Sequence, residues 1–285
     1  MKSPLRIISS ELISDAVASL AKLAATNLPN DVLNVLKKYH CSERNPMASE
    51  FLRQCIENAE IACRDNVPIC QDTGFAVFFI EMGNQLVIEG DTLQEAVDKG
   101  VARGYTEGYL RKSIVNDPVF NRKNTGNNTP SVIHLQQVKG DKIRIVLAPK
   151  GGGSENMSAI KMLKPSDGVQ GIIDFVVDTV TKAGGNPCPP VVVGVGVGGT
   201  FEKCALLAKT ALLRRIGSAN PEPQYADLEQ KLLQKINQSN VGPQGLGGDC
   251  TALAVHVEYH PAHIASMPVA VNLNCHAARH AEITL

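Results

Sequence analysis

A stretch whose side chains could take part in catalysis or metal binding lies at positions 67–74, VPICQDTG. It offers a thiol, an amide, a carboxylate and a hydroxyl in consecutive positions, on Cys70, Gln71, Asp72 and Thr73. The apolar run at 75–80 predicts a buried strand directly afterwards, so these groups would lie at the mouth of a strand, where functional sites are often built. The alternative is a turn with an inert core cysteine, since free cysteines are often buried.

The chain carries eight cysteines and no C-x-x-C pair, which removes the usual zinc-ribbon and thioredoxin signals. Cys55 and Cys63 lie on an apolar helical stripe and are expected to be core thiols, and Cys204, on a later helix, is expected to be buried and unligated. Three others sit at abrupt loop boundaries beside proline, glycine or polar neighbours: Cys70, Cys188 and Cys275. Three thiols without a fourth suit a metal cluster with one corner open for Lewis-acid catalysis, although counting ligands does not exclude zinc.

Groups that bind carboxylates occur elsewhere in the chain. Arg111 follows a predicted helix and precedes a loop, where a guanidinium can clamp a carboxylate or simply complement the helix dipole. The loop of Gly151, Gly152 and Gly153 lies between a predicted strand and a predicted helix at 157–163. It suits a small carboxylate better than a nucleotide, because it lacks the G-K-[ST] ending of a P-loop; the alternative is a bare turn. His263, in a loop, is a candidate for proton chemistry or orientation.

One glycine motif suggests a different ligand, a dinucleotide. Gly194, Gly196 and Gly199 match the G-x-G-x-x-G pattern of dinucleotide-binding proteins. A dinucleotide-binding unit needs a second strand after the helix, ending in an acidic residue, but the chain continues into a loop and a polar helix with no apolar strand. We therefore reject nicotinamide binding.

The apolar periodicity predicts a mixed α/β fold, with helices packed around short sheets. Helices are expected at 13–23, 31–39, 50–64, 93–109, 168–183 and 200–215, and strands at 75–80, 191–197, 251–259 and 268–274. Two further strands, at 131–138 and 142–148, are expected to pair as a β-hairpin across Gly140 and Asp141. The final segment, 277–285, carries no evident signal.

Composition narrows the function classes. With 285 residues, 44% apolar content and equal numbers of acidic and basic residues, the chain is typical of a globular protein with one or two domains. It has no basic cluster for nucleic acid and no segment apolar enough to cross a membrane. Since the start also lacks the apolar core of a signal peptide, we expect a cytoplasmic protein that binds a small ligand.

Seven motifs, in this order, resemble the N-terminal region of the class I, iron–sulfur-dependent fumarate hydratases and L-tartrate dehydratases: VPICQDTG, LRKSIVNDP, KNTGNNTP, KGGGSEN, CPPVVVGVGVGGT, GPQGLGGD and HPAHIASMPVAVNLNCHAARH. The resemblance covers nearly the whole chain and implies one hydro-lyase catalytic domain over residues 1–285, with room for two subdomains. It implies a four-iron four-sulfur cluster with one open iron, held by Cys70, Cys188 and Cys275. It also implies that the substrate is bound by Gln71, Asp72, Arg111 and Gly151–Gly153, and that Asp72 and His263 serve in proton transfer.

The single-chain members of that family continue into a second domain with further substrate ligands and a base, whereas this sequence stops at Leu285. We therefore expect an α subunit that is completed by a separate β subunit and that forms a homo-oligomer. The main interpretation is reversible hydration of fumarate to L-malate, a tricarboxylic acid cycle reaction. The alternatives are L-tartrate dehydratase or mesaconate hydratase, and, from another class, a non-catalytic interaction subunit stabilised by metal.

Overall fold

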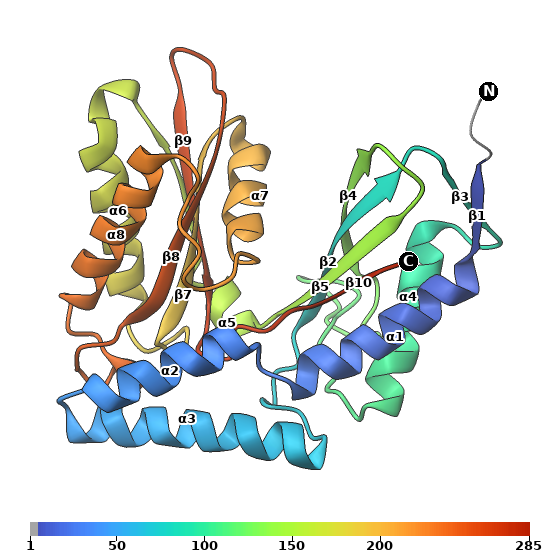
Figure 1. The fold of residues 1–285 in the computed structure, drawn as a ribbon, viewed down its shortest axis with the longest axis horizontal. Coiled ribbons are helices and arrows are strands. Elements are labelled where there is room, and N and C mark those ends of the chain that lie inside the picture. Colours follow the sequence, from blue (N-terminus) through green and yellow to red (C-terminus); the bar gives the residue numbers. More distant parts are fainter. Residues whose placement is uncertain (1–4) are drawn as a thin grey trace. The chain divides into compact units, whose positions relative to one another are not determined.

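The computed structural model describes residues 5–285 and has a mixed α/β fold, as the sequence predicts. It divides into two compact units (Figure 1). The first comprises residues 5–28, 59–151 and 279–285, and the second comprises residues 29–58 and 152–278. The helix α3 (Pro46–Asp65) contains residues of both units. No helix within the described residues is long and apolar enough to cross a membrane.

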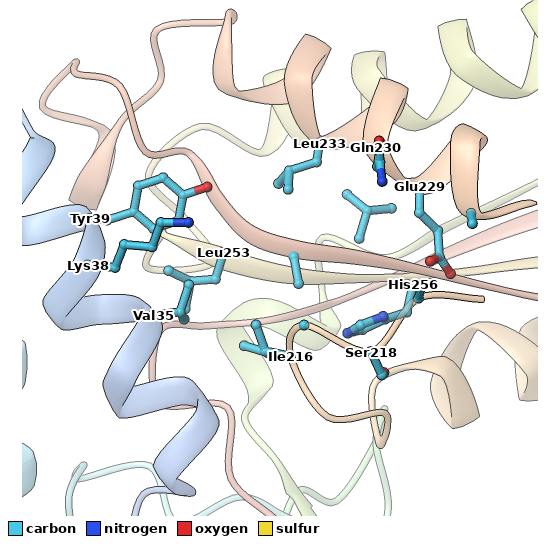
Figure 2. A pocket seen from close by; sticks show the side chains of 15 residues that line it. Val35, Lys38, Tyr39, Ile216, Ser218, Glu229, Gln230, Leu233, Leu253 and His256 are labelled. Carbon is cyan, nitrogen blue, oxygen red and sulfur yellow. The ribbon is translucent and has the colours of Figure 1, made fainter. Parts of the chain in front are cut away.

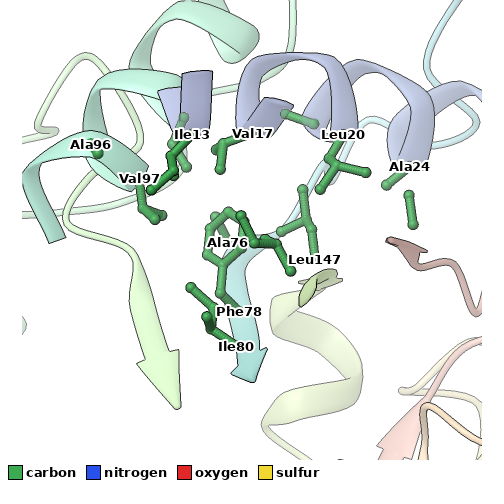
Figure 3. Packing of buried hydrophobic residues seen from close by; sticks show 14 of the residues in the cluster. Ile13, Val17, Leu20, Ala24, Ala76, Phe78, Ile80, Ala96, Val97 and Leu147 are labelled. Carbon is green, nitrogen blue, oxygen red and sulfur yellow. The ribbon is translucent and has the colours of Figure 1, made fainter. Parts of the chain in front are cut away.

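The first unit is built on a four-stranded sheet in the order β10-β5-β2-β4. Its strands are β2 (Phe75–Gly83), β4 (Val132–Val138), β5 (Ile143–Lys150) and β10 (Ala281–Thr284). A two-stranded parallel sheet joins β1 (Arg6–Ser9) to β3 (Leu86–Glu89). The apolar faces of α1 (Ser10–Thr26) and α4 (Leu93–Glu107) pack on the larger sheet, so that Val17 of α1 and Phe78 of β2 share one core (Figure 3).

The predicted β-hairpin is wrong. Both of its strands exist, but β2 lies between them, pairing in parallel with β4 (Val77 with Val132) and antiparallel with β5 (Phe78 with Leu147). Pairing on both sides makes β2 a central strand of the sheet, and its residues Ala76, Phe78 and Ile80 are buried in the core of this unit. A turn signal between two strands therefore indicated a change of direction and not a pairing.

The second unit holds a sheet in the order β6-β9-β7-β8, formed by β6 (Ala159–Leu163), β7 (Val191–Gly198), β8 (Ala252–His260) and β9 (Met267–Asn274). One hydrophobic cluster packs α6 (Gly168–Ala183) and α8 (Pro223–Asn237) on the sheet. A smaller cluster packs α7 (Phe201–Ala211) against Ala270 of β9. The remaining elements are α2 (Asn30–Ser42), α5 (Gly152–Glu155) and the 3-10 turns Pro165–Asp167 and Pro243–Gly245.

Two expectations for this unit need correction. The segment predicted to be a helix at 157–163 contains the strand β6 instead, because it pairs with β9 (Ala159 with Val271). The dinucleotide pattern was rejected for lack of a second strand, yet β8 does return parallel to β7. The glycines nevertheless have a packing explanation: a Cβ on Gly194 or Gly196 would lie 2.1 Å from a carbonyl oxygen of α7, so both residues let that helix lie against the strand.

Candidate active site

The CQDTG turn of the first unit lies tightly against the end of β5. Gly74 has φ of +83°, and a Cβ there would lie 2.8 Å from the backbone nitrogen of Lys150, so only glycine fits. The buried hydroxyl of Tyr105 lies 3.0 Å from the carbonyl oxygens of both Thr73 and Gly74. The Asn128 amide also donates to the Gly74 carbonyl at 3.2 Å. These contacts hold the turn in one conformation.

Asp72 stands at the centre of this turn. Its backbone N–H donates to the Cys70 sulfur at 3.4 Å, and its Oδ1 accepts the N–H of Gly74 at 3.0 Å. Gly151 comes close to the other carboxylate oxygen, since a Cβ on that glycine would lie 3.2 Å from Oδ2. The turn therefore fixes the Asp72 carboxylate beside both Cys70 and the first glycine of the glycine-rich loop.

Arg279, which the sequence did not single out, lies beside the CQDTG turn. It is 5% exposed, and its Nη2 donates to the backbone carbonyl of Asp72 at 2.6 Å. Its Nε is buried with no hydrogen-bond partner among the described residues. Burial raises the pKa of Tyr105 above its usual range, the Arg279 charge opposes that rise and the Asp72 charge adds to it. A cation and a carboxylate therefore both act on this phenol.

Arg279 follows Cys275 by only four positions, and β10, which comes next, pairs with β5 in the first unit. A lone arginine in a short terminal segment gives no periodic signal. The signal that was available is its place within the last family-like motif, HPAHIASMPVAVNLNCHAARH. Lys150, directly before the glycine-rich loop, was also passed over and is 6% exposed.

Gln71 and Arg111 are exposed residues of the same unit. The Thr73 hydroxyl donates to the Arg111 carbonyl at 2.9 Å, which ties the loop after α4 to the CQDTG turn. The first unit thus holds Cys70, Gln71, Asp72, Arg111 and Gly151, with the Arg111 backbone bonded to the CQDTG turn.

The second unit brings Cys188 and Cys275 together at one end of its sheet. Cys188 precedes β7 and Cys275 follows β9, and these strands pair antiparallel with Val192 opposite Asn274. The backbone N–H of His276 lies 3.2 Å from the Cys188 carbonyl, and His276 Nδ1 lies 3.0 Å from the same oxygen. The Phe51 ring meets the His276 imidazole edge-on at 5.5 Å. Both thiols are partly exposed.

Cys55 lies close enough to Cys188 and Cys275 for their charges to affect its pKa. Burial raises the pKa of the Cys55 thiol to about 12, with further contributions from Cys275 and then Cys188. A buried thiol with a raised pKa stays protonated and is a poor metal ligand. The expectation of a structural Cys55 is confirmed, as is that of a buried Cys204, whose sulfur donates to the Gly196 carbonyl. The same expectation is wrong for Cys63, which is exposed and whose sulfur lies 3.1 Å from Asn27 Oδ1.

The rest of the glycine-rich loop belongs to the second unit. Gly152 and Gly153 begin the four-residue helix α5, and a Cβ on Gly153 would lie 3.3 Å from the carbonyl oxygen of Asn186. Asn186 precedes Cys188 by two positions. Within this unit, the loop therefore lies beside the segment that carries one of the candidate cluster ligands.

His263 is not brought to these cysteines within its own chain. It lies in the exposed loop between β8 and β9, whereas Cys275 follows the far end of β9. The eight residues of β9 span about 25 Å at the usual rise of an extended strand. His263 and Cys275 therefore lie at opposite ends of the sheet.

The side chains of Cys70, Cys188 and Cys275 are of the type that holds iron–sulfur clusters, whose usual ligands are cysteine thiolates. No group of three His, Cys, Asp or Glu side chains within residues 5–285 is arranged to hold a metal ion. Cys188 and Cys275 converge in one unit and Cys70 lies in the other, where the Asp72 N–H points at its sulfur. Partly exposed thiols and an N–H···S hydrogen bond are typical of cysteines that hold such clusters.

Comparisons with known proteins place the chain in a family. The family model described as "Fumarate hydratase (Fumerase)" matches residues 14–284. The "Putative L(+)-tartrate dehydratase subunit alpha" of Methanocaldococcus jannaschii is 43% identical over 273 residues, which cover 94% of this chain and 96% of that protein. The "L(+)-tartrate dehydratase subunit alpha" of Escherichia coli is 34% identical over 280 residues, covering 95% and 92%.

Proposed function

Because the chain belongs to the fumarate hydratase family of hydro-lyases, we propose that it is the α subunit of an iron–sulfur enzyme that removes water from a four-carbon hydroxydicarboxylate, with L-tartrate as the substrate. The observation that carries this proposal is the Asp72 carboxylate, which is fixed beside Cys70 and Gly151 with the buried Arg279 behind it.

The choice of L-tartrate revises the interpretation favoured by the sequence. Fumarate hydration was the main interpretation there. The similar proteins named above are tartrate dehydratase α subunits, and they span nearly the same length as this chain. Fumarate hydration remains the second candidate, since the family model carries that description.

Cys70, Cys188 and Cys275 would hold the cluster, which when bound supplies a Lewis acid that polarises the departing hydroxyl. The chain's own groups orient the substrate and move the proton. Arg111 and the N–H groups of the glycine-rich loop offer partners for the substrate carboxylates, and Gln71 offers an amide. Asp72 would deliver a proton to the hydroxyl that leaves as water.

The alternative of a non-catalytic interaction subunit makes a different prediction. Such a subunit would bind metal without an open position that responds to substrate. The absorption spectrum of its cluster would be unchanged by L-tartrate or L-malate, whereas an open iron gives a changed spectrum.

The test of function is anaerobic co-production of this chain with a β subunit, followed by assays with L-tartrate, L-malate and mesaconate. We expect oxaloacetate to form from L-tartrate, with kcat/KM at least about tenfold above that for L-malate dehydration, since a site built for a second hydroxyl discriminates strongly against its absence. The isolated α chain is the control and should show negligible activity. Preference for L-malate would move the proposal to fumarate hydratase, and full activity of the α chain alone would contradict the subunit assignment.

A second copy of the chain is the source of any contribution from His263, because about 25 Å of strand separates this residue from Cys275 of its own chain. The tip of the same loop leaves Ile264 92% exposed, an apolar side chain that a partner could cover. We propose that the α subunit forms a homo-oligomer in which this loop reaches the neighbouring copy's site.

Complementation tests this arrangement. The variants His263→Gln and Cys275→Ser should each lose most activity as pure oligomers. Co-produced and separated by different affinity tags, the mixed oligomer should regain activity, because one of its sites combines an intact Cys275 with an intact His263. A mixed oligomer no more active than the single variants, or a fully active His263→Gln enzyme, would refute the shared site.

A further inference from the structure

The strand β8 lies at an edge of the second sheet and is covered by one stripe of α8. Edge strands direct the N–H and C=O of every second residue away from the sheet, and these groups need partners when they are buried. The stripe consists of α8 residues four positions apart, which therefore share a helix face: Tyr225, Glu229, Leu233 and Asn237. It meets β8 along its length.

Three of these four residues either hydrogen-bond to the backbone of β8 or pack on one of its side chains. Tyr225 stacks on Tyr259 with ring centroids 4.3 Å apart. Glu229 Oε1 accepts the N–H of Val257 at 2.8 Å. Asn237 accepts the N–H of Ala252 at 2.8 Å through Oδ1 and donates to its carbonyl at 3.2 Å through Nδ2. The helix thus replaces a neighbouring strand at both ends of β8.

The fourth residue, Leu233, has no polar group to offer. Val255 and Val257 are two positions apart in the strand. Their N–H and C=O groups are therefore directed toward the same edge of the sheet. Next to it, His256 is 2% exposed, and neither ring nitrogen has a hydrogen-bond partner among the described residues. Unpartnered buried polar groups cost free energy, so their concentration at one place needs an explanation.

A cavity of about 280 Å³ opens at this place (Figure 2). Its apolar wall includes Val35, Ile216, Leu233 and Leu253, and Figure 2 shows the His256 imidazole on the side formed by Ile216 and Ser218. A cavity of about 150 Å³ is enough to hold benzene. None of the cavity's lining residues belongs to the candidate active site.

The carboxylates near the cavity have partners, and the one charged lining residue besides Glu229, Lys38, is exposed. Glu229 is held by Arg214 at 2.6 Å, and Asp31 Oδ2 accepts the N–H of Ile216 at 2.7 Å. Burial, followed by the Arg214 charge, lowers the pKa of His256 to about 4, against smaller opposing effects of Glu229 and Asp31. The imidazole is therefore neutral near pH 7 and presents one donor and one acceptor. This environment favours a neutral ligand.

We propose that this cavity is a second binding site, which accepts a small neutral molecule with an apolar body and a group that both donates and accepts hydrogen bonds, such as a carboxamide. The polar group would lie against His256 and the free edge of Val255, and the body against Leu233 and Leu253. The site requires neither cluster nor β subunit, because every group that forms it belongs to the second unit.

Benzamide and two molecules of similar shape test this site on the full chain labelled at histidine. Acetophenone keeps only the acceptor, and cumene keeps neither polar group. The NMR signal of the His256 ring, identified by its loss in His256→Gln, should move on addition of benzamide. Cumene should bind about tenfold more weakly, the usual effect of losing a hydrogen bond in a buried site.

Two variants separate ligand binding from loss of fold. His256→Leu removes the polar partner and an unsatisfied group together, so the chain should keep its melting temperature but bind benzamide about tenfold more weakly. Leu233→Phe should fill the cavity and reduce binding further, whereas Lys231→Phe, at an exposed position of α8, should have no effect. Three results would overturn the proposal: a His256 signal unmoved by millimolar benzamide, equal binding of cumene, or a signal that moves only when the β subunit is added.

Discussion

Replacing Cys188 or Cys275 by serine should remove the iron–sulfur cluster and lower turnover by at least about a hundredfold, since Lewis-acid polarisation contributes several kcal/mol and each 1.36 kcal/mol is tenfold in rate. Cys70→Ser should do the same. The physical reason is that a serine hydroxyl is not deprotonated near neutral pH and is a poorer ligand for iron than a thiolate. The measurement is iron and sulfide per chain after anaerobic reconstitution, together with the visible absorption of the cluster.

The chain contains its own controls for this experiment. Cys204→Ser makes the same change at a buried cysteine of the second unit, where a hydroxyl can still donate to the Gly196 carbonyl. Cys55→Ala removes the buried thiol whose pKa is affected by the charges of Cys188 and Cys275. Both variants should retain full iron content. Iron lost from Cys204→Ser, or retained by Cys188→Ser, would show that the ligand set is misassigned.

Secondary structure was predicted well where the segment is strongly periodic, and position was predicted well where the residues are adjacent in sequence. The amphipathic patterns gave α1, α3 and α6 within a few positions, because one apolar face of a helix decides where it packs. The polar residues of the CQDTG turn were placed correctly at the mouth of β2. In each case the information is local, carried by a period or by adjacent residues.

Features that depend on distant pairing were not predicted. Nothing in the segments 131–138 and 142–148 shows that β2 separates them, because strand order is set by contacts between residues far apart in the chain. The strand β6 was taken for a helix because five residues do not distinguish the two periods, and its pairing with β9 decides the outcome.

The site was predicted as a set of residues but not as an arrangement. Family-like motifs identified Cys188 and Cys275, and the antiparallel pairing of β7 with β9 explains why they meet. The same β9 carries His263 to the opposite end of the sheet, which a list of motif residues does not reveal. Arg279 was missed because its role arises from burial beside Asp72, a property of the folded chain.

Replacing Asp72 by asparagine should leave the fold and the cluster intact and lower kcat by at least about a hundredfold, within the usual range for a general acid. Asparagine keeps the size of the side chain and an oxygen that can accept the Gly74 N–H, as Asp72 Oδ1 does at 3.0 Å. The backbone contacts of this residue with Cys70 and Arg279 are also kept. Only the titrating carboxyl is lost, so KM should change far less than kcat.

The alternative is that Asp72 serves only to stabilise its turn, a role asparagine fills about equally well. Asp117→Asn is the matched control, because Asp117 Oδ1 accepts the N–H groups of Val119 and Phe120 at 2.8 and 3.1 Å in an exposed turn of the same unit. Both variants should match the parent enzyme in melting temperature and iron content. If Asp72→Asn also matches it in kcat, the carboxylate is structural and the proton must come from another group. A large loss confined to Asp72→Asn, with the cluster spectrum still responsive to substrate, places the proton transfer on this side chain.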